Sequence, residues 1–195
     1  MKNILLISVK YLIVFTIITG ILYPLSITAI GQILFPFKSN GSMVEINGRN
    51  YGSELIAQKF DDDKYFRPRP SATAYSTLPS GGSNLSPASL KLKQVSDSIK
   101  SVFIENNNLE QGTEIPSEMI FKSASGLDPH ISRESAMLQT GRISTARKFN
   151  DEKKLILEQL VEKYTEKPQF GILGQERINV LLINIELDKL QYGRE

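Results

Sequence analysis

The sequence predicts a mixed α/β (α+β) extracytoplasmic domain that is anchored by one N-terminal transmembrane helix. Three observations lead to this prediction. Residues 11–35 contain no charged residue, whereas charged residues of both signs are spread through residues 38–195. Segments of helical periodicity then alternate with short β-branched runs. We therefore expect a cytoplasmic N-terminus over residues 1–10, a transmembrane helix over 11–35, and the extracytoplasmic domain over 38–195.

The uncharged segment 11–35 is long enough to cross a bilayer. At 1.5 Å per residue it spans roughly 37 Å, against a hydrocarbon core of about 30 Å, so it would lie in contact with membrane lipid. Lys10 at its edge can reach the headgroups. A cleaved signal peptide is the rival interpretation, since residues 11–22 suit its apolar region and Pro24 follows. Apolar character continues past Pro24 and no A-x-A-like site follows, which favours an uncleaved span.

The lysines near the N-terminus set the expected orientation. Lys2 and Lys10 precede the span without any acid, while Lys38 and Arg49 follow it among acidic residues. By the positive-inside rule the N-terminus is cytoplasmic and everything after Phe37 is extracytoplasmic. The expected location is the cell membrane (plasma or inner membrane), which the chain crosses once.

One face of the predicted span carries small residues, which allow another helix to approach closely. Gly20 belongs to this face, and Pro24 removes a backbone hydrogen bond that a neighbouring helix can help to compensate. We predict both as partner contacts. An ordinary anchor with scattered small residues is an equal alternative. The residues of this face are Thr16, Thr19, Gly20, Ser26 and Gly31.

The first elements after the span are a hairpin, a short helix and a long loop. Residues 43–52 alternate around Asn47-Gly48, which is a strong hairpin signal, and residues 53–60 suggest a short helix. Residues 61–87 are rich in Pro, Ser, Gly and Asp. Because this stretch also carries interspersed aromatic residues and arginines, we expect an ordered, packed loop rather than a linker.

Three helices are expected after this loop. Ser86-Pro87 is typical of a helix start, and the apolar residues that follow are spaced by 4, 3, 4 and 3. Ser132 can cap a helix that runs to about Lys148, and Asn150 can cap a third. The apolar positions of the first helix are Ala88, Leu92, Val95, Ile99 and Val102, and those of the third are Leu157, Leu160, Val161 and Tyr164.

Two strands complete the prediction. Residues 117–125 suggest a strand that enters a corner at Gly126. Residues 178–187 form a β-branched run in which alternate residues share a face, so this stretch is predicted as a core strand.

Composition excludes several classes of function. Beyond the span, 21 Lys and Arg balance 21 Asp and Glu, so no basic excess is left to bind nucleic acid. The chain has no cysteine and one histidine, which excludes disulfides, thiolate chemistry, and metal sites built from Cys or several His. No P-loop or G-x-S-x-G motif is present. We therefore assign no catalytic residue and no metal ligand, and interpret the Asp61–Asp63 run as a solvated turn.

His130 is the one histidine, and it follows Asp128-Pro129. A Ser–His–Asp arrangement can be assembled from nearby serines, but closeness in sequence does not supply its geometry. Proline fixes the backbone and the Asp side chain can accept backbone N–H groups, so this stretch favours a turn. We interpret His130 as a residue that holds the corner.

Seven stretches, in this order and at these spacings, resemble the C subunit of the Kdp-type potassium-transporting P-type ATPase. They cover the chain from the membrane helix nearly to the C-terminus. The stretches are "YPLSITAIGQILFP" with "NGSMV", "GSELIAQKF", "YFRPRPSATAY", "GGSNLSP", "SASGLDPHIS", "QTGRISTAR" and "INVLLINIELD".

This resemblance implies a non-catalytic accessory subunit of a high-affinity, ATP-driven potassium uptake complex. Its implied partners are the ion-binding A subunit, the ATP-hydrolysing B subunit and a small F subunit. The family is described as a catalytic chaperone that raises the ATP affinity of the B subunit. Gln139 in "MLQTGR" would be the implied nucleotide contact. No tightly bound cofactor is implied, because ATP would be met only transiently at the B subunit.

The predicted topology conflicts with direct ATP contact, since it places Gln139 across a bilayer core of about 30 Å from the nucleotide. We therefore favour assembly and coupling, with the outer domain over the ion entrance of the A subunit. A stand-alone, membrane-tethered ligand-binding domain or hydrolase is the alternative. The loop 61–87 and the corner 125–133 are the predicted contact surfaces, with partner contacts at Arg67, Arg69, Tyr75, Asn84, Asp128 and His130.

Overall fold

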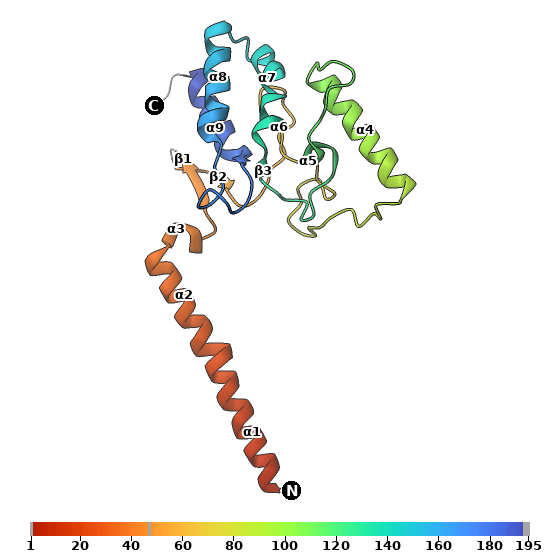
Figure 1. The fold of residues 1–195 in the computed structure, drawn as a ribbon. Coiled ribbons are helices and arrows are strands. Elements are labelled where there is room, and N and C mark those ends of the chain that lie inside the picture. Colours follow the sequence, from red (N-terminus) through yellow and green to blue (C-terminus); the bar gives the residue numbers. More distant parts are fainter. Residues whose placement is uncertain (1, 47, 193–195) are drawn as a thin grey trace. The chain divides into compact units, whose positions relative to one another are not determined.

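The structure is a computed structural model that describes residues 2–46 and 48–192. The chain forms two compact units, one that extends to Ser53 and one that begins at Glu54 (Figure 1). The hairpin that was predicted as part of the extracytoplasmic domain therefore falls in the same unit as the apolar helix.

The first unit is dominated by one long apolar helix. It consists of α1 (Lys2–Ile17), a π-helical turn (Ile18–Leu22) and α2 (Tyr23–Leu34). Residues Asn3–Leu34 are long and apolar enough to cross a membrane, and no other helix among the described residues meets this test. This confirms a single N-terminal apolar helix that fits membrane anchoring, although the helix begins well before residue 11.

The π-helical turn has a local cause in Pro24. Proline has no N–H, so the carbonyl one turn earlier loses its donor. The helix widens at this place, and the Tyr23 N–H donates to the carbonyl of Ile18, five residues back. Hydroxyl groups along the helix donate back to carbonyls four residues earlier, as Thr19 does to Phe15 at 2.7 Å. Hydroxyl donors of this kind are thereby satisfied within the helix, as a hydrocarbon environment requires.

A short helix and a hairpin follow the long helix. Helix α3 covers Pro36–Ser39, and strands β1 (Met43–Ile46) and β2 (Arg49–Ser53) pair antiparallel with a bulge at Val44/Glu45. The predicted hairpin is confirmed. In the turn of this hairpin, Gly48 has a φ of 73°. The other predicted turn residue, Asn47, lies outside the described residues.

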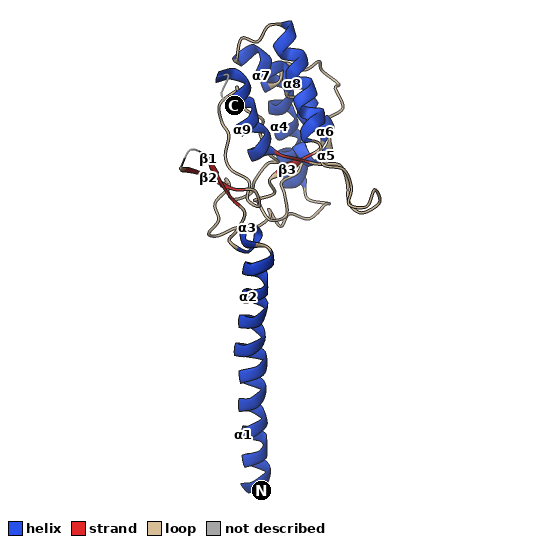
Figure 2. Cartoon of the chain, turned by 90° about the vertical axis from the view of Figure 1, so that its left-hand side faces the viewer, coloured by secondary structure: helices blue, strands red, loops and turns tan. Residues whose placement is uncertain are grey.

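Over its described residues, 54–192, the second unit is mainly helical, with one small sheet in which β3 (His130–Ile131) pairs antiparallel with β4 (Ile178–Asn179). The expected mixture of helix and sheet is therefore confirmed, with less strand than predicted (Figure 2). Its helices are α4 (Leu90–Asn106), α5 (Ser117–Ile120), α6 (Arg133–Met137), α7 (Thr140–Ala146), α8 (Asp151–Tyr164) and α9 (Val180–Tyr192).

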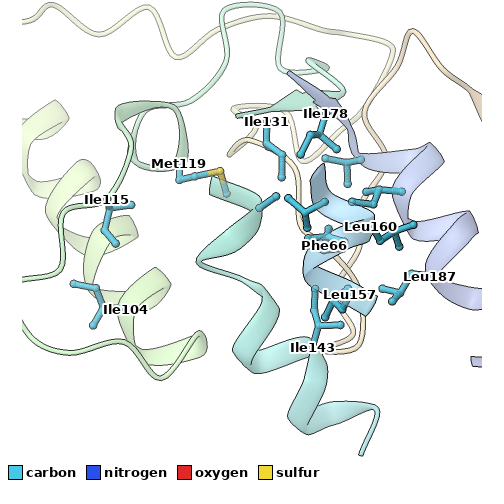
Figure 3. Close-up of a cluster of buried hydrophobic side chains, with 14 residues drawn as sticks. Phe66, Ile104, Ile115, Met119, Ile131, Ile143, Leu157, Leu160, Ile178 and Leu187 are labelled. Carbon is cyan, nitrogen blue, oxygen red and sulfur yellow. The ribbon is translucent and has the colours of Figure 1, made fainter. Parts of the chain in front are cut away.

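Helix α8 is central, since it contacts α6, α7 and α9. The buried side chains between these helices surround Phe66, which comes from the long loop and is fully buried (Figure 3). A loop that supplies the centre of the core is ordered and packed, as predicted for this part of 61–87. The remaining core residues are Ile104, Ile115, Met119, Ile131, Ala136, Ile143, Leu157, Leu160, Val161, Ile178, Val180, Ile183 and Leu187.

The predicted helix caps are confirmed. The Ser132 side chain accepts from the backbone N–H of Ser135, and the Asn150 side chain accepts from that of Lys153. The helix expected from Ser132 to about Lys148 is divided into α6 and α7 by a turn at Leu138 and Gln139. Helix α4 is confirmed, but it begins at Leu90 and its predicted apolar face is only partly covered.

Two short predictions were wrong because distant contacts decide the local conformation. Residues 53–60 were expected to be helical, yet the Ala57 N–H donates to the Leu127 carbonyl (2.9 Å) and the Glu54 carbonyl accepts from the Asn179 side chain (2.7 Å). Residues 117–125 were expected to form a strand but begin with the one-turn helix α5. Glu118 on this turn accepts from the backbone N–H of Ser132 at 2.6 Å.

The predicted core strand 178–187 was also wrong beyond its first two residues. The Asn179 side chain accepts from the N–H groups of Leu181 (3.1 Å) and Leu182 (3.2 Å), which is helix N-capping. Helix α9 follows, and its fully buried residues have helical rather than alternating spacing. They are Val180, Ile183 and Leu187 in the core, with the polar Asn184 beside them.

Candidate functional site

Polar side chains from α7, from its two capping residues and from α9 hold the backbone of residues 63–67. The Asn184 amide accepts from the Phe66 N–H at 2.8 Å and donates to the Phe66 carbonyl at 2.9 Å. The Gln139 amide does the same for Arg67, at 2.8 and 3.2 Å. Two side-chain amides therefore replace the hydrogen bonds that a neighbouring β-strand would supply to the backbone of Phe66 and Arg67.

Two buried arginines extend this arrangement. Arg142 donates to the carbonyls of Asp63 and Tyr65 (3.0 Å for Tyr65). Arg147 donates to the carbonyl of Lys64 at 2.8 Å and lies over the Tyr65 ring, 5.1 Å from its centroid. We call Gln139, Arg142, Arg147 and Asn184 the clamp.

Clamp residues also bond to each other and to one acidic residue. Arg142 donates to the Gln139 Oε1 at 2.9 Å, and Arg147 to the Asp188 carboxylate at 2.7 Å. Burial, and secondly the charge of Arg67, lower the pKa of Arg142 to about 10. This value is still well above neutrality, so Arg142 is charged and its hydrogen bonds to carbonyls are charge-assisted.

The position of Gln139 bears on the implied nucleotide contact. Its side chain is 0 % exposed, and its amide also donates to the Ser135 carbonyl at 3.3 Å. Both ends of the amide are thus engaged inside the domain. In this conformation Gln139 presents no polar atom to a ligand, and contact with ATP would require the clamp to open.

The predicted corner packs directly on the long loop. The Ser123 N–H donates to the Pro70 carbonyl at 3.0 Å. Gly126 has a φ of 72°, and a Cβ at this position would lie 2.8 Å from the Gly81 carbonyl oxygen and 2.9 Å from the Thr73 Oγ1. Glycine is therefore required here both by backbone conformation and by space.

Asp128 links the corner to the loop. Its carboxylate accepts from Arg69 Nη1 at 2.8 Å and from the backbone N–H of His130 at 3.1 Å, with His130 Nδ1 at 3.5 Å. Burial raises the pKa of Asp128, but the bonds from His130 and from Arg69 outweigh it and bring the pKa to about 2. The carboxylate is therefore ionised near neutral pH. This is the geometry of a fixed turn, in keeping with the interpretation of His130.

Five of the eight predicted contact residues line one of two cavities. Arg69, Asp128 and His130 line a groove of about 620 Å³. Arg67 and Tyr75 line a second cavity of about 390 Å³ beside α4.

The other three predicted contacts lie outside both groups. Asn84 is exposed, with a φ of 52°, and lines neither cavity. Gly20 and Pro24 lie exposed on the long helix of the first unit. The structure therefore brings together three of the eight residues at one groove.

The acidic run Asp61–Asp63 does not converge on a common point. Asp61 pairs with Lys59 at 2.7 Å, Asp62 with Lys64 at 3.0 Å, and Asp63 with Arg67 at 2.7 Å. Each carboxylate thus has a cation of its own. Within residues 2–46 and 48–192, no group of three or more potential metal-ligating side chains occurs.

Arg142, Arg147, Asn184 and Glu118 were missed by the sequence reasoning. For Asn184 the sequence offered one signal. It is a polar residue on the face of a helix whose other positions, Ile183 and Leu187, are apolar. For Arg142 and Arg147, the spacing from Gln139 places all three on neighbouring turns around α7, facing residues 63–67.

The chain matches the family model described as "K+-transporting ATPase, c chain" over residues 5–189. Similar curated proteins each carry the name potassium-transporting ATPase KdpC subunit. One from Leptospira interrogans is 45% identical over 95% of this chain and 94% of its own length. One from Methylococcus capsulatus is 43% identical over 92% and 94%, and one from Mycobacterium tuberculosis is 40% identical over 97% and 100%.

Proposed function

The chain belongs to the KdpC family of K+-transporting ATPase subunits, so its role in potassium transport is accessory, and we propose that it supports assembly and coupling of the pump from the outer side of the membrane. The observation that carries this proposal is the combination of family membership with a single apolar helix, Asn3–Leu34. One helix cannot enclose an ion pathway by itself. The ion pathway would therefore reside in the A subunit and ATP hydrolysis in the B subunit of the Kdp pump, with a small F subunit as a further partner.

The proposed contact surface is the corner 125–133 together with the loop 61–87. Three features support this choice. Residues 63–67 of the loop are held by the clamp, the corner packs on the loop at Gly126, and Arg69 and Asp128 form an ion pair between loop and corner. A surface that is rigid before binding loses little conformational entropy when it docks. In this proposal the surface lies over the ion entrance of the A subunit.

Any effect on the ATP affinity of the B subunit would be allosteric in this proposal. The closed clamp supports this, because Gln139 is buried and its amide is bound inside the domain. A coupling free energy of about 1–3 kcal/mol between distant sites is typical of proteins and corresponds to a 5- to 150-fold change in affinity. Such coupling needs no contact between this chain and the nucleotide.

Co-purification tests the proposed function. The full chain with a C-terminal tag is purified from detergent-solubilised membranes of potassium-starved cells. We expect much larger multi-span subunits to remain bound and the preparation to hydrolyse ATP. An unrelated single-pass protein with the same tag is the control. Recovery of the chain alone, with a ligand or hydrolytic activity of its own, would instead support the stand-alone alternative.

A further inference from the structure

A hairpin arm, residues 166–177, joins α8 to α9 (the blue segment between them in Figure 1). Its stem is closed by backbone bonds between Glu166 and Arg177 at 2.8 and 3.2 Å, and by an ion pair of the same two side chains at 3.0 Å. Near its end, Gln169 and Leu173 exchange two backbone bonds of 2.9 Å each. The arm is therefore a defined element rather than an irregular connection.

The tip of the arm exposes apolar side chains. Phe170 is 89% exposed, Ile172 is 81% exposed and Leu173 is 57% exposed. Residues 168–175 contain no charged residue. Burial of such a side chain stabilises by about 1.5–3 kcal/mol. At these three neighbouring positions the side chains stay exposed, so a partner could still gain this free energy by covering them.

The backbone of the tip is also strained. Phe170 has a φ of 54°, a conformation that is unfavourable for a bulky residue by roughly 1–2 kcal/mol. Gly171 and Gly174 also have positive φ values, 76° and 90°, but glycine adopts them without such a cost. The turn thus presents an aromatic ring to solvent at the expense of backbone strain. Strain of this kind is found where the surrounding structure or a binding partner requires it.

The arm is continuous with the proposed contact surface. The groove of about 620 Å³ has Arg69, Asp128 and His130 among its lining residues, and residues 166–169 and 173–177 of the arm line it as well. A partner that contacts the corner 125–133 would therefore meet the arm next. The tip adds apolar contact area to a surface that is otherwise made of charged and polar groups.

Charge indicates what kind of surface the tip fits. In the arm Glu166 and Glu176 are balanced by Lys167 and Arg177, so its net charge is zero. Attraction to an anionic lipid surface requires an excess of Lys and Arg, which the arm does not have. Depletion of charged residues and enrichment of aromatic residues are instead typical of the centre of a protein interface.

We propose that the tip, Phe170 with Ile172 and Leu173, inserts into an uncharged apolar pocket on a neighbouring subunit of the pump. This inference rests on the proposed function, and it adds an anchor point that is separate from the corner and from the membrane helix. The polar groove beside the arm would then provide orientation, and the tip would provide most of the affinity.

Photo-crosslinking in intact membranes tests the proposal. The full chain carries p-benzoylphenylalanine in place of Phe170 or, as the control, in place of Leu155, which is 56% exposed on α8 and lines neither cavity. At position 170 we expect a product that mass spectrometry identifies as a multi-span subunit of the pump. At position 155, which lies outside the proposed contact surface, that product should be at least about tenfold weaker, because only the anchor is buried in the interface.

A paired substitution provides a second measurement. Phe170→Ser with Ile172→Ser should lower the yield of co-purified subunits about tenfold, whereas Leu155→Ser should not change it. Because all three side chains are exposed, thermal unfolding of the full chain should stay as in the wild type. Crosslinks from position 170 to lipid or to a second copy, or unchanged co-purification of the double variant, would overturn the docking proposal but not the proposed function. Failure of the wild-type chain to co-purify would defeat both.

Discussion

Gly126→Ala is expected to destabilise the folded unit that begins at Glu54 by about 2–5 kcal/mol. Roughly 1–2 kcal/mol comes from placing an L-residue at a φ of 72°. A further 1–3 kcal/mol comes from overpacking, because the new Cβ would lie 2.8 Å from the backbone oxygen of Gly81, which cannot rotate away as a side chain can. Thermal unfolding of the full chain in detergent, followed by circular dichroism, measures the effect.

Gly112→Ala is the matched control for this prediction. Gly112 also has a positive φ, of 98°, but a Cβ there would meet no atom within 4 Å. It should therefore show only the backbone cost of roughly 1–2 kcal/mol. The difference between the two variants isolates the contact between the corner and the loop. Equal destabilisation of both would mean that the corner does not pack on Gly81 as described.

Gln139→Leu is expected to destabilise the same unit by about 3–5 kcal/mol, since it leaves several buried polar groups without partners at roughly 1–3 kcal/mol each. The N–H and carbonyl of Arg67 lose the Gln139 amide, and Arg142 loses one acceptor. The segment 63–67 should loosen before the domain unfolds globally. Hydrogen exchange of the Arg67 amide measures this loosening directly, and the expected result is loss of its protection.

Gln94→Leu is the control for the clamp, because Gln94 is exposed on α4 and the same change there should stay within about 0.5 kcal/mol. This experiment distinguishes the two roles of Gln139, as a structural residue of the clamp or as a contact to the nucleotide. If Gln139→Leu left stability and Arg67 protection unchanged but raised the KM of the pump for ATP, Gln139 would be a nucleotide contact and the clamp interpretation would be wrong.

Local chemistry made part of this fold predictable from sequence. The hairpin around Gly48, the caps at Ser132 and Asn150, and the corner after Gly126 depend on residues only a few positions apart. Each has a turn or capping mechanism that the sequence displays. These predictions were confirmed, and the corner is part of the candidate site.

The failures arose where distant residues decide the conformation. Residues 178–187 satisfy both alternation and helical spacing when only apolar residues are counted, and the deciding features were the cap at Asn179 and the buried Asn184. The bonds between Asn184 and Phe66 join residues that are 118 positions apart. A single sequence carries no direct signal for such a pair, so the clamp could not be predicted although the ordered loop could.

Accessibility of an introduced cysteine tests the central claim most directly, which is that the unit beginning at Glu54 lies outside the cytoplasmic membrane. The chain has no cysteine of its own, so Asn3→Cys and Lys154→Cys, both at exposed positions, report without background. Intact cells, or spheroplasts where an outer membrane is present, are treated with a membrane-impermeant maleimide. The account predicts labelling at position 154 and protection at position 3 until the membrane is opened. Labelling at position 3 with protection at position 154 would contradict it and would bring Gln139 to the side of the membrane where ATP is found.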